Sequence, residues 1–167
     1  MSPRLLTITT ALALCASVAS AQAPQTTTEL KNGTGQVIGK ATLVDAPKGV
    51  LLKVEVKGLA PGWHGLHFHE KADCSKADFT SAGGHTHGGG DRVHGLLNPK
   101  ANETGDLPNL YVAADGTGST EVFSSLTTLA ALKDADGSAV LIHAGADDHQ
   151  TQPIGGAGAR VACGEIK

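Results

Sequence analysis

Short runs of β-type residues, rather than helical repeats, dominate the pattern of apolar and polar positions along this chain. In the segment 50–57, apolar and charged residues alternate from Leu52 onward, which is the period-two pattern of a strand with one face in water. Similar runs complete a set of eight predicted strands, at residues 26–31, 35–44, 65–70, 110–114, 119–123, 139–143 and 161–166.

Turn-forming residues punctuate these runs, as at Asn32-Gly33 and Asp115-Gly116. Many short strands with regular turns predict an all-β antiparallel sandwich or barrel. Neither an internal repeat nor a linker divides the sequence, so we expect one domain over residues 22–167.

Two long polar stretches interrupt the strand pattern, at residues 74–108 and 144–159. Both are rich in glycine and carry histidines and acidic residues. Long loops inside a compact domain are usually functional, so we expect the site to be built on them.

The first residues have the pattern of a secretory signal peptide, which we expect at 1–21. Arg4 is followed by an uncharged, largely apolar run, and Ala19 and Ala21 suit a cleavage site. This run is too short and too rich in Thr and Ser to span a membrane, so we expect no membrane partner and a periplasmic or secreted product.

The charge balance bears on the partner. The chain has 13 Lys and Arg against 16 Asp and Glu, a formal net charge of −3. Nucleic acid is therefore not an expected partner, because phosphate binding needs a basic face. A small anion is not excluded, since a local basic group can attract it.

The histidines are clustered, because six of the eight lie between residues 64 and 94. His67 and His69 are two apart on a predicted strand, so their side chains leave the same face, whereas His64 points away. His143 ends another predicted strand. Several imidazoles without a thiolate suit copper, zinc or nickel, and spacing alone does not choose the ion or its chemistry.

Three cysteines are present, and Cys15 falls within the predicted signal peptide. Cys74 and Cys163 then remain as an isolated pair, which in an oxidising compartment predicts a disulfide.

These residues, taken together, resemble the copper/zinc superoxide dismutase family, and within it the secreted bacterial branch. The resemblance implies an eight-stranded Greek-key β-barrel with two long functional loops. It is carried, in family order, by 62–70 (GWHGLHFHE), Cys74, 81–85 (SAGGH), 94–95 (HG), 105–110 (GDLPNL), 142–148 (IHAGADD) and 158–164 (GARVACG).

The resemblance also implies roles for individual residues. Copper would be held by His67, His69 and His143 together with His85, which would bridge to zinc and supply a proton. Zinc would also be held by His94 and Asp106. Arg160 would dock the anion, Asp147 would link a copper histidine to a zinc histidine, and Cys74 and Cys163 would form the disulfide.

The implied activity is the copper-catalysed disproportionation of superoxide to dioxygen and hydrogen peroxide. The alternative is a non-catalytic copper-binding or carrier protein of the same fold. Arg160 favours the enzyme, because a carrier has no use for a group that docks an anion. Family members include monomers and dimers, so the resemblance leaves both a monomer and a homodimer as possible oligomeric states.

One zinc ligand of the family pattern is missing, because Glu103 stands where the family has a histidine. Three interpretations stay open: Glu103 completes the zinc site, His87 completes it, or both are solvated loop residues and the enzyme works with copper alone.

The second loop carries no lysine, so we expect only a modest dependence of the rate on salt, arising from Arg160 with Lys71 or Lys76. His149, in the same loop, is expected to be a surface residue.

Overall fold

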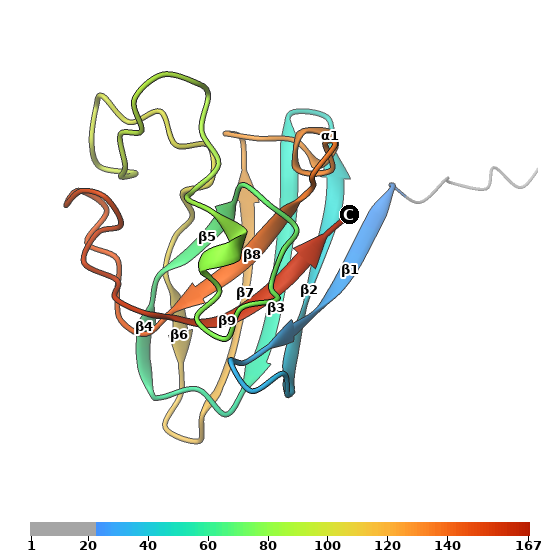
Figure 1. Ribbon diagram of the computed structural model, residues 1–167, viewed down its shortest axis with the longest axis vertical. Coiled ribbons are helices and arrows are strands. Elements are labelled where there is room, and N and C mark those ends of the chain that lie inside the picture. Colours follow the sequence, from blue (N-terminus) through green and yellow to red (C-terminus); the bar gives the residue numbers. More distant parts are fainter. Residues whose placement is uncertain (1–22) are drawn as a thin grey trace, which may run out of the picture.

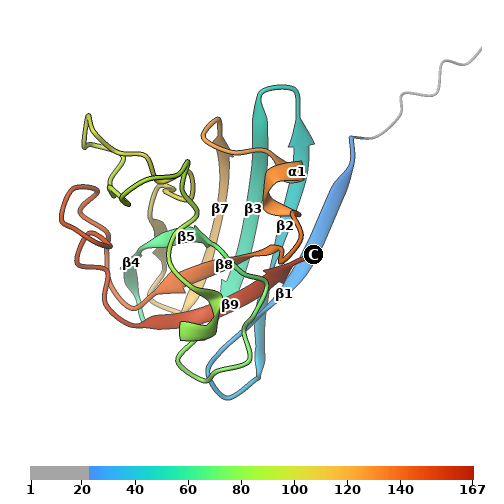
Figure 2. The ribbon, with the colours of Figure 1, turned by 45° about the horizontal axis from the view of Figure 1, so that its top comes forward.

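The computed structural model describes residues 23–167, and its nine antiparallel strands form one sheet that curls into a nearly closed barrel (Figures 1 and 2). Within residues 23–167, helix is limited to a 3-10 turn, Thr80–Ala82, and the short α1, Leu129–Leu132. The predicted all-β fold is therefore confirmed. The strands are β1 (Gln25–Lys31), β2 (Val37–Ala46), β3 (Gly49–Lys57), β4 (Gly62–His64), β5 (Leu66–His69), β6 (Leu110–Val112), β7 (Thr117–Ser124), β8 (Ser138–His143) and β9 (Arg160–Ile166).

Each of the eight predicted strands is present, and the structure adds the short β4. This strand pairs with β6, where Trp63 lies opposite Tyr111. This strand was not predicted because it is short and begins at Gly62, which belongs to the Pro61-Gly62 turn signal.

The chain itself joins the two ends of the sheet. The strand order is β4-β6-β7-β3-β2-β1-β9-β8-β5, so β4 and β5 lie at opposite ends and yet follow each other in sequence through Gly65. A Cβ at Gly65 would lie 2.9 Å from the Cβ of Ala157 and 3.2 Å from Cε1 of His67. The missing side chain therefore allows the loop after β8 to pack against the start of β5.

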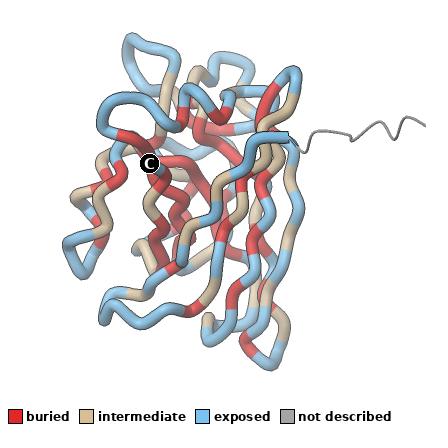
Figure 3. The backbone as a smooth tube through the Cα atoms, turned by 90° about the vertical axis from the view of Figure 1, so that its right-hand side faces the viewer, coloured by how far each residue is buried: buried red, intermediate tan, exposed pale blue. Residues whose placement is uncertain are grey.

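The core lies inside the barrel, and buried and exposed positions alternate along several strands (Figure 3). In β3, Leu52, Val54 and Val56 are buried, and Lys53 and Glu55 between them are exposed. Each large apolar side chain removed from water contributes about 2 kcal/mol to the hydrophobic driving force, so this inner layer stabilises the scaffold that carries the site.

The two long loops lie side by side at one end of the barrel (Figures 1 and 2). Leu97 of the first loop donates its backbone N–H to the carbonyl of His149 in the second, over 3.1 Å. Gln152 donates its side-chain amide to the carbonyl of His94 at 2.8 Å and accepts the N–H of His94 at 2.8 Å. These bonds fix the two loops relative to each other.

The predicted signal peptide, residues 1–21, lies outside the described residues. Within residues 23–167, none of the helices has the length and apolar character needed to cross a membrane.

Candidate metal centre

Four buried imidazoles converge beside the barrel wall. His67 and His69 lie on β5, His143 ends β8, and His85 belongs to the first long loop. A ligand nitrogen of each lies within 4.8 Å of those of the other three, and each residue is at most 2% exposed. The structure thus brings together the four residues expected to bind copper.

Hydrogen bonds to Nδ1 of His69 and of His143 determine that Nε2 of each ring faces the other histidines. Nδ1 of His69 lies 3.0 Å from the carbonyl oxygen of Gly83, and Nδ1 of His143 lies 3.0 Å from that of Gly158. Because a carbonyl only accepts, each Nδ1–H donates and each Nε2 keeps its lone pair.

His67 is held the other way round. Its Nε2 donates to Oδ2 of Asp147 over 2.7 Å, which leaves Nδ1 with the lone pair. His85 directs Nδ1 toward Glu103 at 2.6 Å and Nε2 toward the other three rings. Nδ1 of His67 and Nε2 of His69, His85 and His143 have no hydrogen-bond partner among residues 23–167.

Such unpartnered buried nitrogens are rare in folded proteins, and each needs an explanation. Four of them at one point, all able to offer a lone pair, fit a metal that accepts imidazole nitrogen, such as copper.

Burial keeps three of these rings, those of His67, His69 and His143, neutral. It lowers the pKa of His67 to about 3, although the hydrogen bond that His67 donates to Asp147 raises it, and lowers the pKa of His143 to about 4. It also holds the pKa of His69 well below its ordinary value. Neutral imidazole is the form that binds a metal, so the fold prepares the ligands at neutral pH.

A second group adjoins the first and contains acidic residues. His85, His94 and Asp106 bring ligand atoms within 4.8 Å of one another, together with His67. Nδ1 of His94 lies 2.8 Å from Oδ1 of Asp106, and Oε2 of Glu103 lies 2.9 Å from the same nitrogen and 2.6 Å from Nδ1 of His85. Glu103 is only 5% exposed, so its carboxylate is not a solvated loop group.

The other candidate for the missing ligand, His87, is oriented differently. Its backbone pairs with Glu103 in an isolated β-bridge, but its ring Nε2 lies 3.9 Å from Oε1 of Glu70. Its side chain is 26% exposed. The His87 ring therefore faces Glu70, outside the second group, whereas the Glu103 carboxylate contacts the two histidines of that group.

This second group attracts a cation. Burial lowers the pKa of His94, but the hydrogen bonds that its ring donates to Asp106, Asp147 and Glu103 outweigh this effect and raise that pKa to about 11. For Asp106 the effects have the opposite sign. Burial raises its pKa, but the hydrogen bonds that it accepts from His85 and His94 outweigh burial and hold the pKa below its ordinary value. Zinc accepts nitrogen and carboxylate oxygen, so the donor set fits that ion.

Asp147 connects the two groups, as expected. Its Oδ2 accepts from His67, and its Oδ1 accepts from Nε2 of His94 at 3.0 Å. Asn109 holds this residue by accepting the N–H of Asp147 at 2.9 Å and donating to its carbonyl at 2.8 Å. The sequence analysis gave Asn109 no role, because irregular loops show no periodicity that would reveal such contacts.

His149 is not the surface residue that we expected. Its side chain is 19% exposed, and its Nδ1 lies 3.4 Å from Oδ2 of Asp147. Its backbone N–H donates to Oδ1 of Asp147 over 2.6 Å, and Nδ2 of Asn109 lies 3.2 Å from its Nε2. The left-handed backbone at His149, with φ of 60°, turns the residue back onto the carboxylate.

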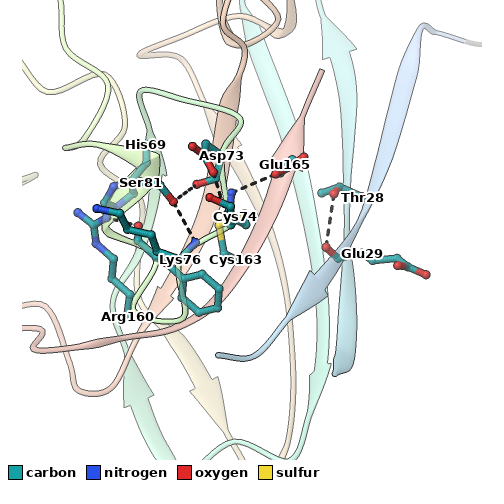
Figure 4. Close-up of a disulfide and its surroundings, with 12 residues drawn as sticks. Thr28, Glu29, His69, Asp73, Cys74, Lys76, Ser81, Arg160, Cys163 and Glu165 are labelled. Atoms are coloured by element: carbon teal, nitrogen blue, oxygen red, sulfur yellow. Dashed lines mark hydrogen bonds between the residues drawn. A yellow bond between two sulfur atoms is a disulfide. The ribbon is translucent and has the colours of Figure 1, made fainter. Parts of the chain in front are cut away.

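The predicted disulfide between Cys74 and Cys163 is present and ties the first loop to β9 (Figure 4). Arg160, at the start of β9, donates from Nη1 to the carbonyl of Phe79 over 2.5 Å and from Nη2 to that of Gly83 over 2.6 Å. Gly83 also accepts from His69, so one carbonyl holds both the guanidinium and a copper-group imidazole.

A cavity of about 280 Å³ adjoins the copper group at His143. His143 and Arg160 line it, together with Asp78, Thr80 and Ile154. The Arg160 guanidinium thus lies at the same cavity as a residue of the copper group.

Comparison with known proteins assigns this arrangement to a family. The family model described as copper/zinc superoxide dismutase matches residues 37–166. The chain belongs to the copper/zinc superoxide dismutase family. A relative from Caulobacter vibrioides, named superoxide dismutase [Cu-Zn], is 58% identical over 147 residues, which cover 84% of each chain.

Solved structures of this family show the same fold. The Cu/Zn superoxide dismutase from Brucella abortus matches with a TM-score of 0.73 and 33% identity, over 86% of this chain and all of that one. A superoxide dismutase-like protein from Bacillus subtilis matches with a TM-score of 0.75 and 35% identity, over 84% of this chain and 97% of that one. The expected family and its barrel are therefore confirmed.

Proposed function

We propose that this chain disproportionates superoxide at a copper ion held by His67, His69, His85 and His143. The observation that carries the proposal is the convergence of four buried imidazole lone pairs without hydrogen-bond partners in the described part of the chain. Membership of the family and a 58% identical relative named superoxide dismutase support the reaction.

The reaction turns two superoxide anions and two protons into dioxygen and hydrogen peroxide. When bound, copper supplies the one-electron exchange in which one anion is oxidised and the other reduced. Arg160 attracts and docks the anion, because a guanidinium stays charged and Nη1 and Nη2 are already anchored to carbonyls.

His85 is suited to deliver a proton. Its Nε2 faces the copper group, and its Nδ1 faces Glu103. Burial lowers the pKa of His85, but hydrogen bonds to Asp106 and Glu103 outweigh it and raise that pKa above its ordinary value. When Nε2 is not bound to a metal, the ring can carry a proton there and donate it to the reduced anion. Asp147 fixes the ring of His67 by accepting from its Nε2.

For zinc we propose the ligands His85, His94, Asp106 and Glu103. The support is the position of Oε2 of Glu103, within 2.9 Å of a nitrogen of both histidines, and the outward ring of His87. A bound zinc would replace the hydrogen bonds that now join these side chains, and would hold the first loop against β5.

The competing function is that of a copper carrier without turnover, and the test compares copper-loaded wild type with Arg160→Ala. As an enzyme, the wild type disproportionates superoxide well above the metal-free protein, and the variant loses at least about tenfold in kcat/KM while still binding copper. Copper-loaded wild type with no activity above the metal-free protein would instead indicate a carrier.

We also propose that residues 1–21 are a cleaved signal peptide and that the mature domain, 22–167, acts in the periplasm or outside the cell. Amino-terminal sequencing of the protein from the native cell should begin at Gln22. A mature protein that begins at Met1 or Ser2 would overturn this proposal.

Self-association to a homodimer is a further proposal. Trp63 and Tyr111 are each more than half exposed, and their rings contact each other at a centroid distance of 5.0 Å on the outer face of β4 and β6. Sedimentation equilibrium gives the mass directly, and a monomer at micromolar concentration would contradict the proposal.

A further inference from the structure

Asp78 places a negative charge at the cavity that adjoins the copper group. It lines this cavity together with Arg160 and His143. Its neighbour in sequence, Phe79, provides the carbonyl that accepts from Nη1 of Arg160. Asp78 is therefore tied by the backbone to the group that docks the substrate.

The carboxylate is fixed in place rather than free to turn away. Its Oδ1 accepts the N–H of Thr80 at 3.0 Å and the hydroxyl of Thr80 at 2.8 Å. These hydrogen bonds lower the pKa of Asp78, so the group is charged at neutral pH. No ion pair within 4.0 Å joins Asp78 to Arg160 in the described chain, so contact does not cancel the two charges.

We propose that Asp78 slows the capture of superoxide, because its charge opposes the attraction that Arg160 exerts on the entering anion. This inference rests on the proposed function, since superoxide is the anion concerned. It makes Asp78 a residue that sets the rate of substrate approach, without contact with the reacting atoms.

The field of Asp78 reaches the guanidinium. Burial lowers the pKa of Arg160, and the charge of Asp78 opposes that change. The nearby Lys76 acts on Asp78 in turn and contributes to the lowering of its pKa. Loss of the Asp78 charge would therefore leave two cations, Arg160 and Lys76, to attract the anion.

The chain offers a close control in Asp115, in the turn between β6 and β7. Its Oδ1 accepts the N–H of Thr117 at 3.0 Å and the hydroxyl of Thr117 at 2.7 Å, so the local structure repeats that around Asp78. Both aspartates are exposed. Asp78→Asn and Asp115→Asn remove the same charge from the same kind of turn, and asparagine supports that turn as well.

The experiment measures kcat/KM of copper-loaded wild type, Asp78→Asn and Asp115→Asn over a range of salt concentrations, with copper content determined for each. We expect Asp78→Asn to exceed wild type by about twofold at low ionic strength and to match it near 1 M salt, where charges are screened within about 3 Å. Asp115→Asn should follow wild type throughout.

Azide binding gives a second readout that does not depend on turnover. Titration of azide, a small anion, into the copper-loaded proteins is followed by visible absorption. The dissociation constant for Asp78→Asn should be about twofold lower than for wild type or Asp115→Asn at low salt.

Equal rates and equal azide affinities for the two variants would overturn the inference, and so would a fall in rate for Asp78→Asn. A wild type that shows no dismutation would instead contradict the proposed function, and the azide titration would still report on Asp78.

Discussion

At the scale of the residue, the chemistry of the site depends on the partner of each imidazole rather than on the imidazole alone. The carbonyls of Gly83 and Gly158 take the Nδ1–H of His69 and His143, while Asp147 takes the Nε2–H of His67. Each ring thereby has a fixed tautomer before any metal arrives. Because the ligand nitrogens need no change of tautomer or orientation to bind a metal, the fold itself preorganises the site.

Replacement of the Glu103 carboxylate tests the zinc ligands. Glu103→Gln keeps the shape of the side chain and removes its charge, so we expect the zinc affinity to fall by about 10- to 100-fold. His87→Gln is the control and should leave the affinity unchanged. Competition with a chromophoric chelator measures the zinc dissociation constant of each variant. A loss of zinc affinity in His87→Gln but not in Glu103→Gln would contradict Glu103 as the ligand and favour His87.

At the scale of the element, the site depends on the turn from β4 into β5. Gly65 carries the chain from one end of the sheet to the other, and its N–H donates to the carbonyl of Gly145 at 2.8 Å. His67 and His69 follow immediately on β5, and the loop that holds Asp147 packs over Gly65. Barrel closure and ligand position are therefore set by the same few residues.

Gly65→Ala tests this coupling. The added methyl group would lie 2.9 Å from the Cβ of Ala157 and 3.2 Å from the His67 ring, so we expect a loss of about 1–3 kcal/mol in the free energy of unfolding and weaker copper binding. Gly88→Ala is the control, because its nearest neighbour would be 3.8 Å away. Urea unfolding measures stability, and two variants of equal stability would contradict the role of Gly65.

At the scale of the whole molecule, the sequence predicted the barrel well and the loops only in part. Runs of β-type residues identified eight of the strands, whereas β4 is short and begins at the glycine of a Pro-Gly turn signal. The spacing of His67 and His69 predicted a shared face. The roles of Asn109 and Gln152 in holding the two loops depend on contacts between distant residues of irregular backbone, which no local pattern reveals.

The stability of the metal-free protein should fall as pH falls from about 6.5 to 4. The pKa values of His67, about 3, and His143, about 4, lie below that of an imidazole in the unfolded chain, near 6.5. In this window the unfolded chain binds protons that the folded chain does not, so acid favours unfolding by about 1.4 kcal/mol per pH unit for each such group.

His94 does not contribute to this pH dependence of stability. Its pKa of about 11 keeps it protonated in the folded state, and an imidazole in the unfolded chain is also protonated below about pH 6.5. Urea unfolding of metal-free protein at intervals between pH 4 and 7 measures the dependence. A stability that stays constant over this range would show that these rings are not buried in their neutral form.

The position of copper in a crystal of the loaded protein, located by anomalous scattering at the copper absorption edge, tests the central claim most directly. We predict one strong peak at bonding distance from Nδ1 of His67 and from Nε2 of His69, His85 and His143. A copper peak bound elsewhere, with these four nitrogens hydrogen-bonded to water or to protein, would contradict the account.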